Sequence, residues 1–358
     1  MILAKCFEKE WIENRSTYFK RSRVKADPEL IEKVIHALHL LEALSKINIE
    51  FVFKGGTSLL LLLNKIHRFS IDIDVIIDPK TKADLEAKLE NIVSISSAFF
   101  KYEKQQRETK LNVPKDHYKF FYTSKIDHTE RYILLDILFE ENPYSNLVER
   151  DIICDFIESD GDITKVCIPS RECILGDKLT AFAPNTTGIP YNKGKELEII
   201  KQLFDVSNLF DEFTDLSIVT ENFKKIASQE INYRDRNDIT YTDVLDDMFK
   251  TSINLASRGY LNETNFKDLE DGVKKIKSYI FSGNFIIENA IECSGKVAYL
   301  ASAIKNNISA LELHNENIDI TKLTFSSPVY SKKFKGIKKF SSSGYYYLYK
   351  ALELNPID

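Results

Sequence analysis

One segment, residues 54–77, constrains the fold more than any other part of the chain, and it reads KGGTSLLLLLNKIHRFSIDIDVII. Two adjacent glycines follow a short apolar run, a leucine-rich stretch comes next, and the last run carries two aspartates separated by one residue. Alternating apolar residues predict a strand, whereas the leucine-rich stretch predicts a helix. We therefore expect strands over 50–54 and 71–77, joined by a glycine turn and a helix over 57–65.

The two aspartates of this segment have the chemistry of metal ligands. Side chains alternate along a strand, so Asp72 and Asp74 are expected on one face, about 7 Å apart, with Ile73 pointing into the core. Two such carboxylates can share a divalent cation, and Mg²⁺ or Mn²⁺ prefers hard oxygen ligands. Asp136, inside the apolar run YILLDILF, is the candidate third ligand, because an unpaired charge there is costly. The alternative is an edge-strand aspartate that faces water.

The glycines and the residues that follow them have the features of a phosphate site. Gly55 and Gly56 let backbone N–H groups approach a triphosphate closely, and the following helix N-terminus adds its dipole. Thr57 and Ser58 add hydroxyl donors. Arg68, in the turn before the second strand, completes the set of candidate nucleotide-binding residues. A lone Asp-x-Asp or Gly-Gly pair is common, but the two in this order and spacing are a specific signal.

The combined pattern resembles the nucleotidyltransferase signature of the DNA polymerase β superfamily, a glycine turn followed by an Asp-x-Asp strand. More narrowly, GGTSL followed by RFSIDID resembles the AbiEii/AbiGii family of nucleotidyltransferase toxins, with Ile71 where that family often has a carboxylate. A second block, ECILGDKLTAFAPNTTGIPY and then KQLFDV, is also similar to that family. It places Lys178, Lys201 and Asp205 at matching positions, with Gln202 in place of an acidic residue.

The resemblance assigns catalytic roles to Lys178 and Asp205. Lys178 is a candidate for contacting the triphosphate and the charge that develops during transfer. The alternative is a surface lysine in a capped helix. For Asp205 the alternative is an ion pair with Lys201, because residues four apart share a helical face.

The resemblance also implies the reaction and the partners. The reaction would be in-line transfer of a nucleoside monophosphate from an NTP to a hydroxyl, assisted by Mg²⁺. The chain would be a toxin of a toxin–antitoxin or phage-defence pair, with RNA such as the tRNA 3′ end as acceptor and a cognate antitoxin as partner. Two alternatives stay open. One is a small-molecule, aminoglycoside-type nucleotidyltransferase, which needs an acidic acceptor pocket. The other is a non-catalytic nucleotide-binding partner protein, which the intact aspartate pair argues against.

The chain is acidic as a whole, with a net charge of −5, which excludes a general nucleic-acid-binding protein. Two clusters of basic residues stand out against this background, and each could follow a phosphate backbone or form a solvated face. They are Lys20, Arg21, Arg23 and Lys25 near the start, and Lys332, Lys333, Lys335, Lys338 and Lys339, with Phe334 and Phe340, near the end.

Periodicity along the chain predicts an α/β half followed by a mainly helical half. Apolar spacing predicts a helix over 28–47, and two strand-like runs over 117–124 and 131–139 predict a hairpin. We expect a polymerase β-like core with a mixed sheet and N-terminal helices over 1–205, and a helical C-terminal domain over 206–358.

The cysteines and the apolar runs bear on location. Five scattered cysteines without a Cys-x-x-Cys pair predict neither a zinc site nor a disulfide framework, and they suit a reducing compartment. The N-terminal residues lack the pattern of a signal peptide. No apolar run approaches the roughly 20 residues of a membrane span. We expect a cytoplasmic enzyme without a membrane partner.

Overall fold

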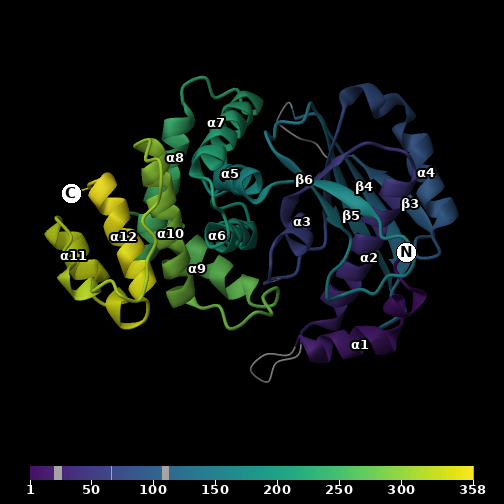
Figure 1. The fold of residues 1–358 in the computed structure, drawn as a ribbon, viewed down its shortest axis with the longest axis horizontal. Coiled ribbons are helices and arrows are strands. Elements are labelled where there is room, and N and C mark those ends of the chain that lie inside the picture. Colours follow the sequence, from purple (N-terminus) through teal and green to yellow (C-terminus); the bar gives the residue numbers. More distant parts are fainter. Residues whose placement is uncertain (20–25, 66, 107–112, 358) are drawn as a thin grey trace. The chain divides into compact units, whose positions relative to one another are not determined.

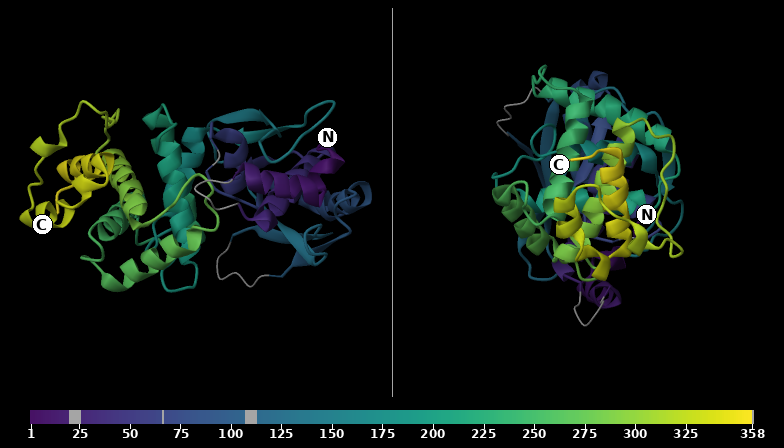
Figure 2. Two further views of the ribbon diagram at one scale, coloured as in Figure 1. Left: turned by 90° about the horizontal axis from the view of Figure 1, so that it is seen from below. Right: turned by 90° about the vertical axis from the view of Figure 1, so that its left-hand side faces the viewer.

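The computed structural model describes residues 1–19, 26–65, 67–106 and 113–357, which form two compact units (Figures 1 and 2). The first unit comprises Met1–Ser170 with Ser278–Asn284, and the second comprises Arg171–Lys277 with Phe285–Asp358. The division therefore falls after Ser170, earlier than the boundary after residue 205 that we predicted. The reason is that the helix after Ser170 packs against helices of the second unit.

A five-stranded mixed sheet forms the centre of the first unit, with strand order β1-β2-β5-β4-β3. The central pair β2 and β5 is parallel and the other pairs are antiparallel. The strands are β1 (Val52–Lys54), β2 (Ile73–Ile77), β3 (Lys101–Gln105), β4 (Lys115–Thr123) and β5 (Glu130–Phe139). The predicted mixed sheet and the hairpin, now β4 and β5, are confirmed. A separate antiparallel pair consists of β6 (Leu147–Asp151) and β7 (Lys165–Pro169).

Helices cover this sheet and connect its strands (Figure 1). The longest, α2 (Pro28–Lys46), packs against β2 and β5, and the Asp27 side chain caps it by accepting from the Glu29 N–H at 2.9 Å. The other elements are η1 (Ala4–Phe7), α1 (Lys9–Tyr18), α3 (Gly55–Leu62), η2 (Pro79–Asp84) and α4 (Leu85–Ile95).

The regular elements described in the second unit are all helical, which confirms the predicted fold class. The long helix α10 packs against α8 and α12, and most of its side chains are buried. The bounds are α5 (Arg171–Ala181), α6 (Glu196–Phe210), α7 (Leu216–Tyr233), α8 (Tyr241–Ala256), α9 (Glu263–Ile276), α10 (Ile287–Lys305), η3 (Ile320–Lys322), α11 (Pro328–Phe334), η4 (Ile337–Lys339) and α12 (Ser342–Leu354). Among the described residues, none of the helices has the length and apolar character needed to cross a bilayer.

Candidate active site

Asp74 and Asp136 are register partners on the parallel strands β2 and β5. Paired residues on neighbouring strands, about 4.8 Å apart, project to the same face, so both carboxylates lie on one side of the sheet. We expected the second strand to begin at residue 71, but it begins at Ile73, and Asp72 is an exposed residue just before it. Ile73 itself is fully buried, as predicted.

The charges of these aspartates act on one another. The pKa of Asp74 is raised to about 7, first by burial and then by the negative charges of Asp136 and Asp72. Lys115 and Lys54 oppose this shift. When ionised, Asp74 is repelled by the Asp136 and Asp72 carboxylates, and a bound cation would offset this repulsion. The three aspartates could therefore hold a divalent cation, which their hard oxygen donors suit.

His117 is a member of this site that sequence reasoning missed. It is the register partner of Asp136 on β4, and its Nδ1 lies 2.6 Å from Asp136 Oδ1. Such a hydrogen bond fixes the orientation of a ligand carboxylate. Within the described part of the chain, no three His, Cys, Asp or Glu side chains already form a metal cage. The aspartates would thus have to draw together around a bound ion.

The glycine pair packs directly against Asp74. Gly55 has a φ of +80°, and a Cβ there would lie 2.2 Å from Asp74 Oδ2. A Cβ on Gly56 would lie 2.6 Å from Ser70 Oγ. Helix α3 begins at Gly55, two residues earlier than expected. Its first N–H groups, which lack helical partners, therefore start beside the aspartates, where a phosphate would be bound.

The side chains of Thr57, Ser58 and Arg68 are buried. Thr57 Oγ1 donates to the Asp72 carbonyl oxygen at 2.5 Å, and Ser58 Oγ donates to the Gly55 carbonyl oxygen at 2.9 Å. Arg68 Nη1 donates to the Phe69 carbonyl oxygen at 2.8 Å. We expected the two hydroxyls to donate to a triphosphate, but in the structure they hold the glycine loop and Asp72 in place.

Lys178 and Asp205 form a buried ion pair in the second unit. Lys178 on α5 is 7% exposed and Asp205 on α6 is 2% exposed, and Lys178 Nζ lies 2.7 Å from Asp205 Oδ2. Gln202 Oε1 accepts a further hydrogen bond from Lys178 Nζ at 3.4 Å. The surface-lysine alternative for Lys178 is therefore wrong. Lys201 Nζ instead hydrogen-bonds to Glu198 Oε1 at 2.9 Å.

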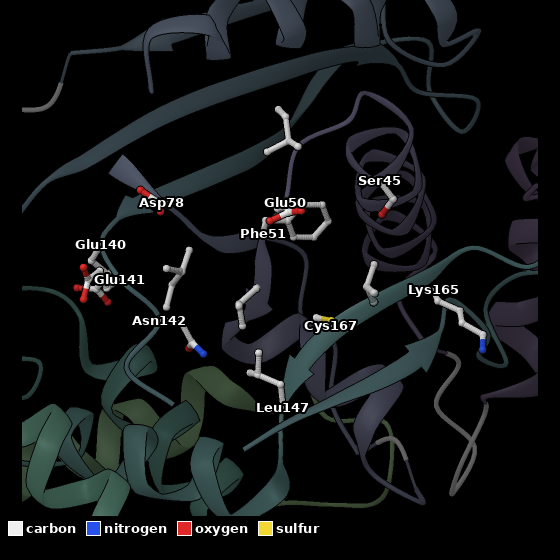
Figure 3. Close-up of a pocket in the computed structure, with 14 residues that line it drawn as sticks. Ser45, Glu50, Phe51, Asp78, Glu140, Glu141, Asn142, Leu147, Lys165 and Cys167 are labelled. Carbon is white, nitrogen blue, oxygen red and sulfur yellow. The ribbon is translucent and has the colours of Figure 1, made fainter. Parts of the chain in front are cut away.

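A cavity of about 670 Å³ lies in the first unit, beside β1, β7 and the carboxyl end of β2 (Figure 3). Figure 3 shows Asp78, Glu140 and Glu141 on one side of it and Lys165 on the other. Asp78, the residue just after β2, follows Asp74 by four residues of extended chain, which separates them by roughly 13 Å. This acidic cavity is therefore a different place from the aspartate site.

The close approach of Gly55 to Asp74 leads to a first prediction. Gly55→Ala combines a left-handed backbone with a steric overlap on the Asp74 carboxylate, so we expect it to destabilise the fold by about 3 kcal/mol. Gly161→Ala is the matched control, since Gly161 has a φ of +64° and nothing within 4 Å of a Cβ. It should lose only about 1 kcal/mol. Equal losses in urea unfolding would contradict the proposed overlap.

Residues 39–281 match the family described as the nucleotidyl transferase AbiEii toxin, type IV toxin–antitoxin system. Among solved structures, JHP933 from Helicobacter pylori is similar with a TM-score of 0.44 and 16% identity, over 77% of this chain and 94% of that one. An antigenic nucleotidyltransferase-like protein from Paracoccidioides brasiliensis gives 0.39 and 15%, over 66% and 93%. No curated protein matches the sequence.

Proposed function

Because the chain belongs to the AbiEii family of nucleotidyltransferase toxins, we propose that it transfers a nucleoside monophosphate from an NTP to a hydroxyl of RNA, such as the tRNA 3′ end. The observation that carries the proposal is the cross-strand pairing of Asp74 with Asp136. Asp72, Asp74 and Asp136 would hold Mg²⁺ or Mn²⁺. A cognate antitoxin is the proposed protein partner.

In this proposal, residues of the first unit have separate roles in phosphoryl transfer. When bound, the cation neutralises charge on the triphosphate and on the attacking oxygen. His117 holds the Asp136 carboxylate in position through its 2.6 Å hydrogen bond. Gly55 leaves room for Asp74, and the N–H groups at the start of α3 donate to phosphate oxygens.

Lys178 and Asp205 enter the proposal as one pair from the second unit. The ion pair with Asp205 holds the Lys178 side chain in one orientation. We propose that Lys178 contacts the nucleotide and that Asp205, 2.7 Å away, positions it. The family-like block that contains both residues supports this assignment.

The acidic cavity bears on the small-molecule alternative. A cationic acceptor such as an aminoglycoside would need carboxylates beside the metal aspartates. Glu140, Glu141 and Asp78 do line a cavity. Asp78, however, lies just beyond the end of β2, roughly 13 Å from Asp74, so these carboxylates are not beside the metal aspartates. RNA is therefore the acceptor class that we propose.

The test is incubation of the full chain with each α-labelled NTP, Mg²⁺ and total RNA, followed by separation of labelled RNA. We expect label on RNA from at least one NTP, and loss of that label when EDTA replaces Mg²⁺. Transfer that persists in EDTA would contradict the metal role. Label on an added aminoglycoside, with none on RNA, would favour the small-molecule alternative.

A further inference from the structure

A long stretch of the second unit carries positive charge alone. Between Ile320 and Leu352 the sequence has seven lysines and no aspartate or glutamate, in a chain whose net charge is −5. The lysines at its two ends have carboxylate partners, Lys322 with Asp319 and Lys350 with Glu353. Within the described residues, the five lysines between them have no carboxylate within 4.0 Å. An unneutralised cluster of this kind attracts a polyanion.

The fold explains why this charge is exposed. Tyr330 and Phe334 of α11 are buried and pack against each other at 5.5 Å. The lysines around them therefore point to solvent. We expected Phe334 to interleave with the lysines at the surface, but it is fully buried, whereas Phe340 is 41% exposed. We call the exposed lysines Lys332, Lys333, Lys335 and Lys339 the lysine surface.

A cavity of about 330 Å³ adjoins this surface. Four asparagines, two tyrosines and Lys250 are among its lining residues, and the side-chain amides of Asn185 and Asn254 hydrogen-bond within the protein. We call it the amide cavity. Pockets that hold small ligands have roughly this size or more, so it has room for a nucleoside and not for a folded polymer. Aromatic walls and amide groups recognise the faces and the edges of a heterocyclic base.

Contacts between aromatic rings join the cavity to the lysines. Tyr330, in the cavity wall, contacts the Tyr260 ring at 6.1 Å. Tyr260 is 48% exposed, and Lys333 Nζ lies 4.6 Å from its ring centre. Glu263, the nearest carboxylate in sequence to Tyr260, is paired with Lys267 at 2.9 Å. The cavity, an exposed aromatic ring and the lysine surface are thus continuous.

We infer that this surface binds single-stranded RNA. One unstacked base enters the amide cavity, Tyr260 stacks on a neighbouring base, and the lysine surface contacts the phosphates. Only a single strand can place a base in such a cavity, because a duplex keeps its bases stacked. The choice of RNA over single-stranded DNA rests on the proposed function. An acidic protein would use the lysines but would leave the cavity and the ring without a role.

The experiment measures binding of a fluorescent 12-nucleotide RNA to the full chain by anisotropy, across a series of salt concentrations. NTP and divalent cations are left out. The triple variant Lys332→Gln/Lys333→Gln/Lys335→Gln should bind about tenfold more weakly and lower the salt slope by about two units, since each phosphate contact on a single strand contributes roughly 0.7. Tyr260→Ala should weaken binding roughly tenfold without changing the salt slope. Tyr260→Phe, which retains the aromatic ring, should bind with unchanged affinity.

The matched control neutralises three other exposed lysines of the second unit, Lys225, Lys274 and Lys275, and changes the net charge equally. Circular dichroism and melting curves verify that every variant is folded. Equal affinity and slope in the two triple variants would overturn the assignment. Displacement of the RNA by poly-glutamate at equal charge concentration would also overturn it, in favour of an acidic protein partner. Failure of nucleotidyl transfer with intact RNA binding would count against the proposed function alone.

Discussion

We expect Asp74→Asn to lower nucleotidyl transfer at least about a thousandfold, which corresponds to roughly 4 kcal/mol of activation free energy. Asp74 interacts electrostatically with both of the other carboxylates, since the charges of Asp136 and Asp72 each raise its pKa. An amide removes the charge and leaves one weak oxygen donor, so the cation is lost or misplaced. Single-turnover transfer from a labelled NTP measures the loss.

Asp78→Asn is the matched control for this variant. Asp78 follows the same strand, lines the acidic cavity, and caps η2 by accepting from the Lys80 N–H at 2.9 Å. Asparagine caps helices about as well as aspartate, so the fold should be unchanged. We expect transfer close to the unsubstituted rate. A similar loss in both variants would show that negative charge in general, and not a metal ligand, supports the reaction.

The same substitution should stabilise the metal-free fold at high pH. The pKa of Asp74 is about 7 in the folded protein, above its ordinary value of roughly 3.9. A raised carboxyl pKa means that folding favours the protonated form, so stability is lost as the pH rises from about 4 through 7. Asparagine imitates the protonated form. In EDTA at pH 8, the free energy of unfolding of Asp74→Asn should therefore exceed that of the unsubstituted protein by at least about 1 kcal/mol. This difference should disappear towards pH 4. A destabilised variant at pH 8 would contradict this.

Local pattern was enough to locate the aspartate site. Alternation around Ile73 predicts a strand, and a charge inside YILLDILF is costly unless it is used, which singled out Asp136. The pairing of Asp136 with Asp74 and with His117 depends on strand register across distant segments, which a single sequence does not specify. The contact of Gly55 with Asp74 is equally nonlocal, so the glycine suggested a phosphate site and not a packing constraint.

Strands β3 and β6 escaped prediction because their composition is polar. The segments KYEKQ, which forms β3, and LVERD, which forms β6, contain three charged residues each, and neither shows an apolar alternation. Both lie at the edge of a sheet and pair with one neighbour, so their partners stabilise them more than their own residues do. The domain boundary differed for a related reason. Helix α5 has an ordinary amphipathic pattern, and only its packing against α6 and α7 assigns it to the helical unit.

Lys178→Met should destabilise the protein by about 3–5 kcal/mol, because it leaves the buried Asp205 carboxylate without its charge partner. Methionine retains the length and apolar stem of lysine, so the loss reports the charge and not a cavity. Lys296→Met is the matched control. Lys296 is also buried and lies 2.6 Å from Asp211, but the Asp211 side chain is 55% exposed. Water can solvate Asp211 once it is unpaired, and we expect the smaller loss from urea unfolding of the control.

The double variant Lys178→Met/Asp205→Leu separates a structural from a catalytic role. Replacing both members of a buried ion pair with apolar residues of similar volume is often neutral for stability, so this variant should recover most of the stability that Lys178→Met loses. Recovery of the fold cannot restore the Lys178 ammonium group that we propose contacts the nucleotide. If the pair is catalytic, the double variant is folded and transfers no nucleoside monophosphate. Lys296→Met, which removes a buried lysine charge elsewhere in the same unit, should keep transfer. Normal transfer by the refolded double variant would limit Lys178 and Asp205 to holding α5 against α6.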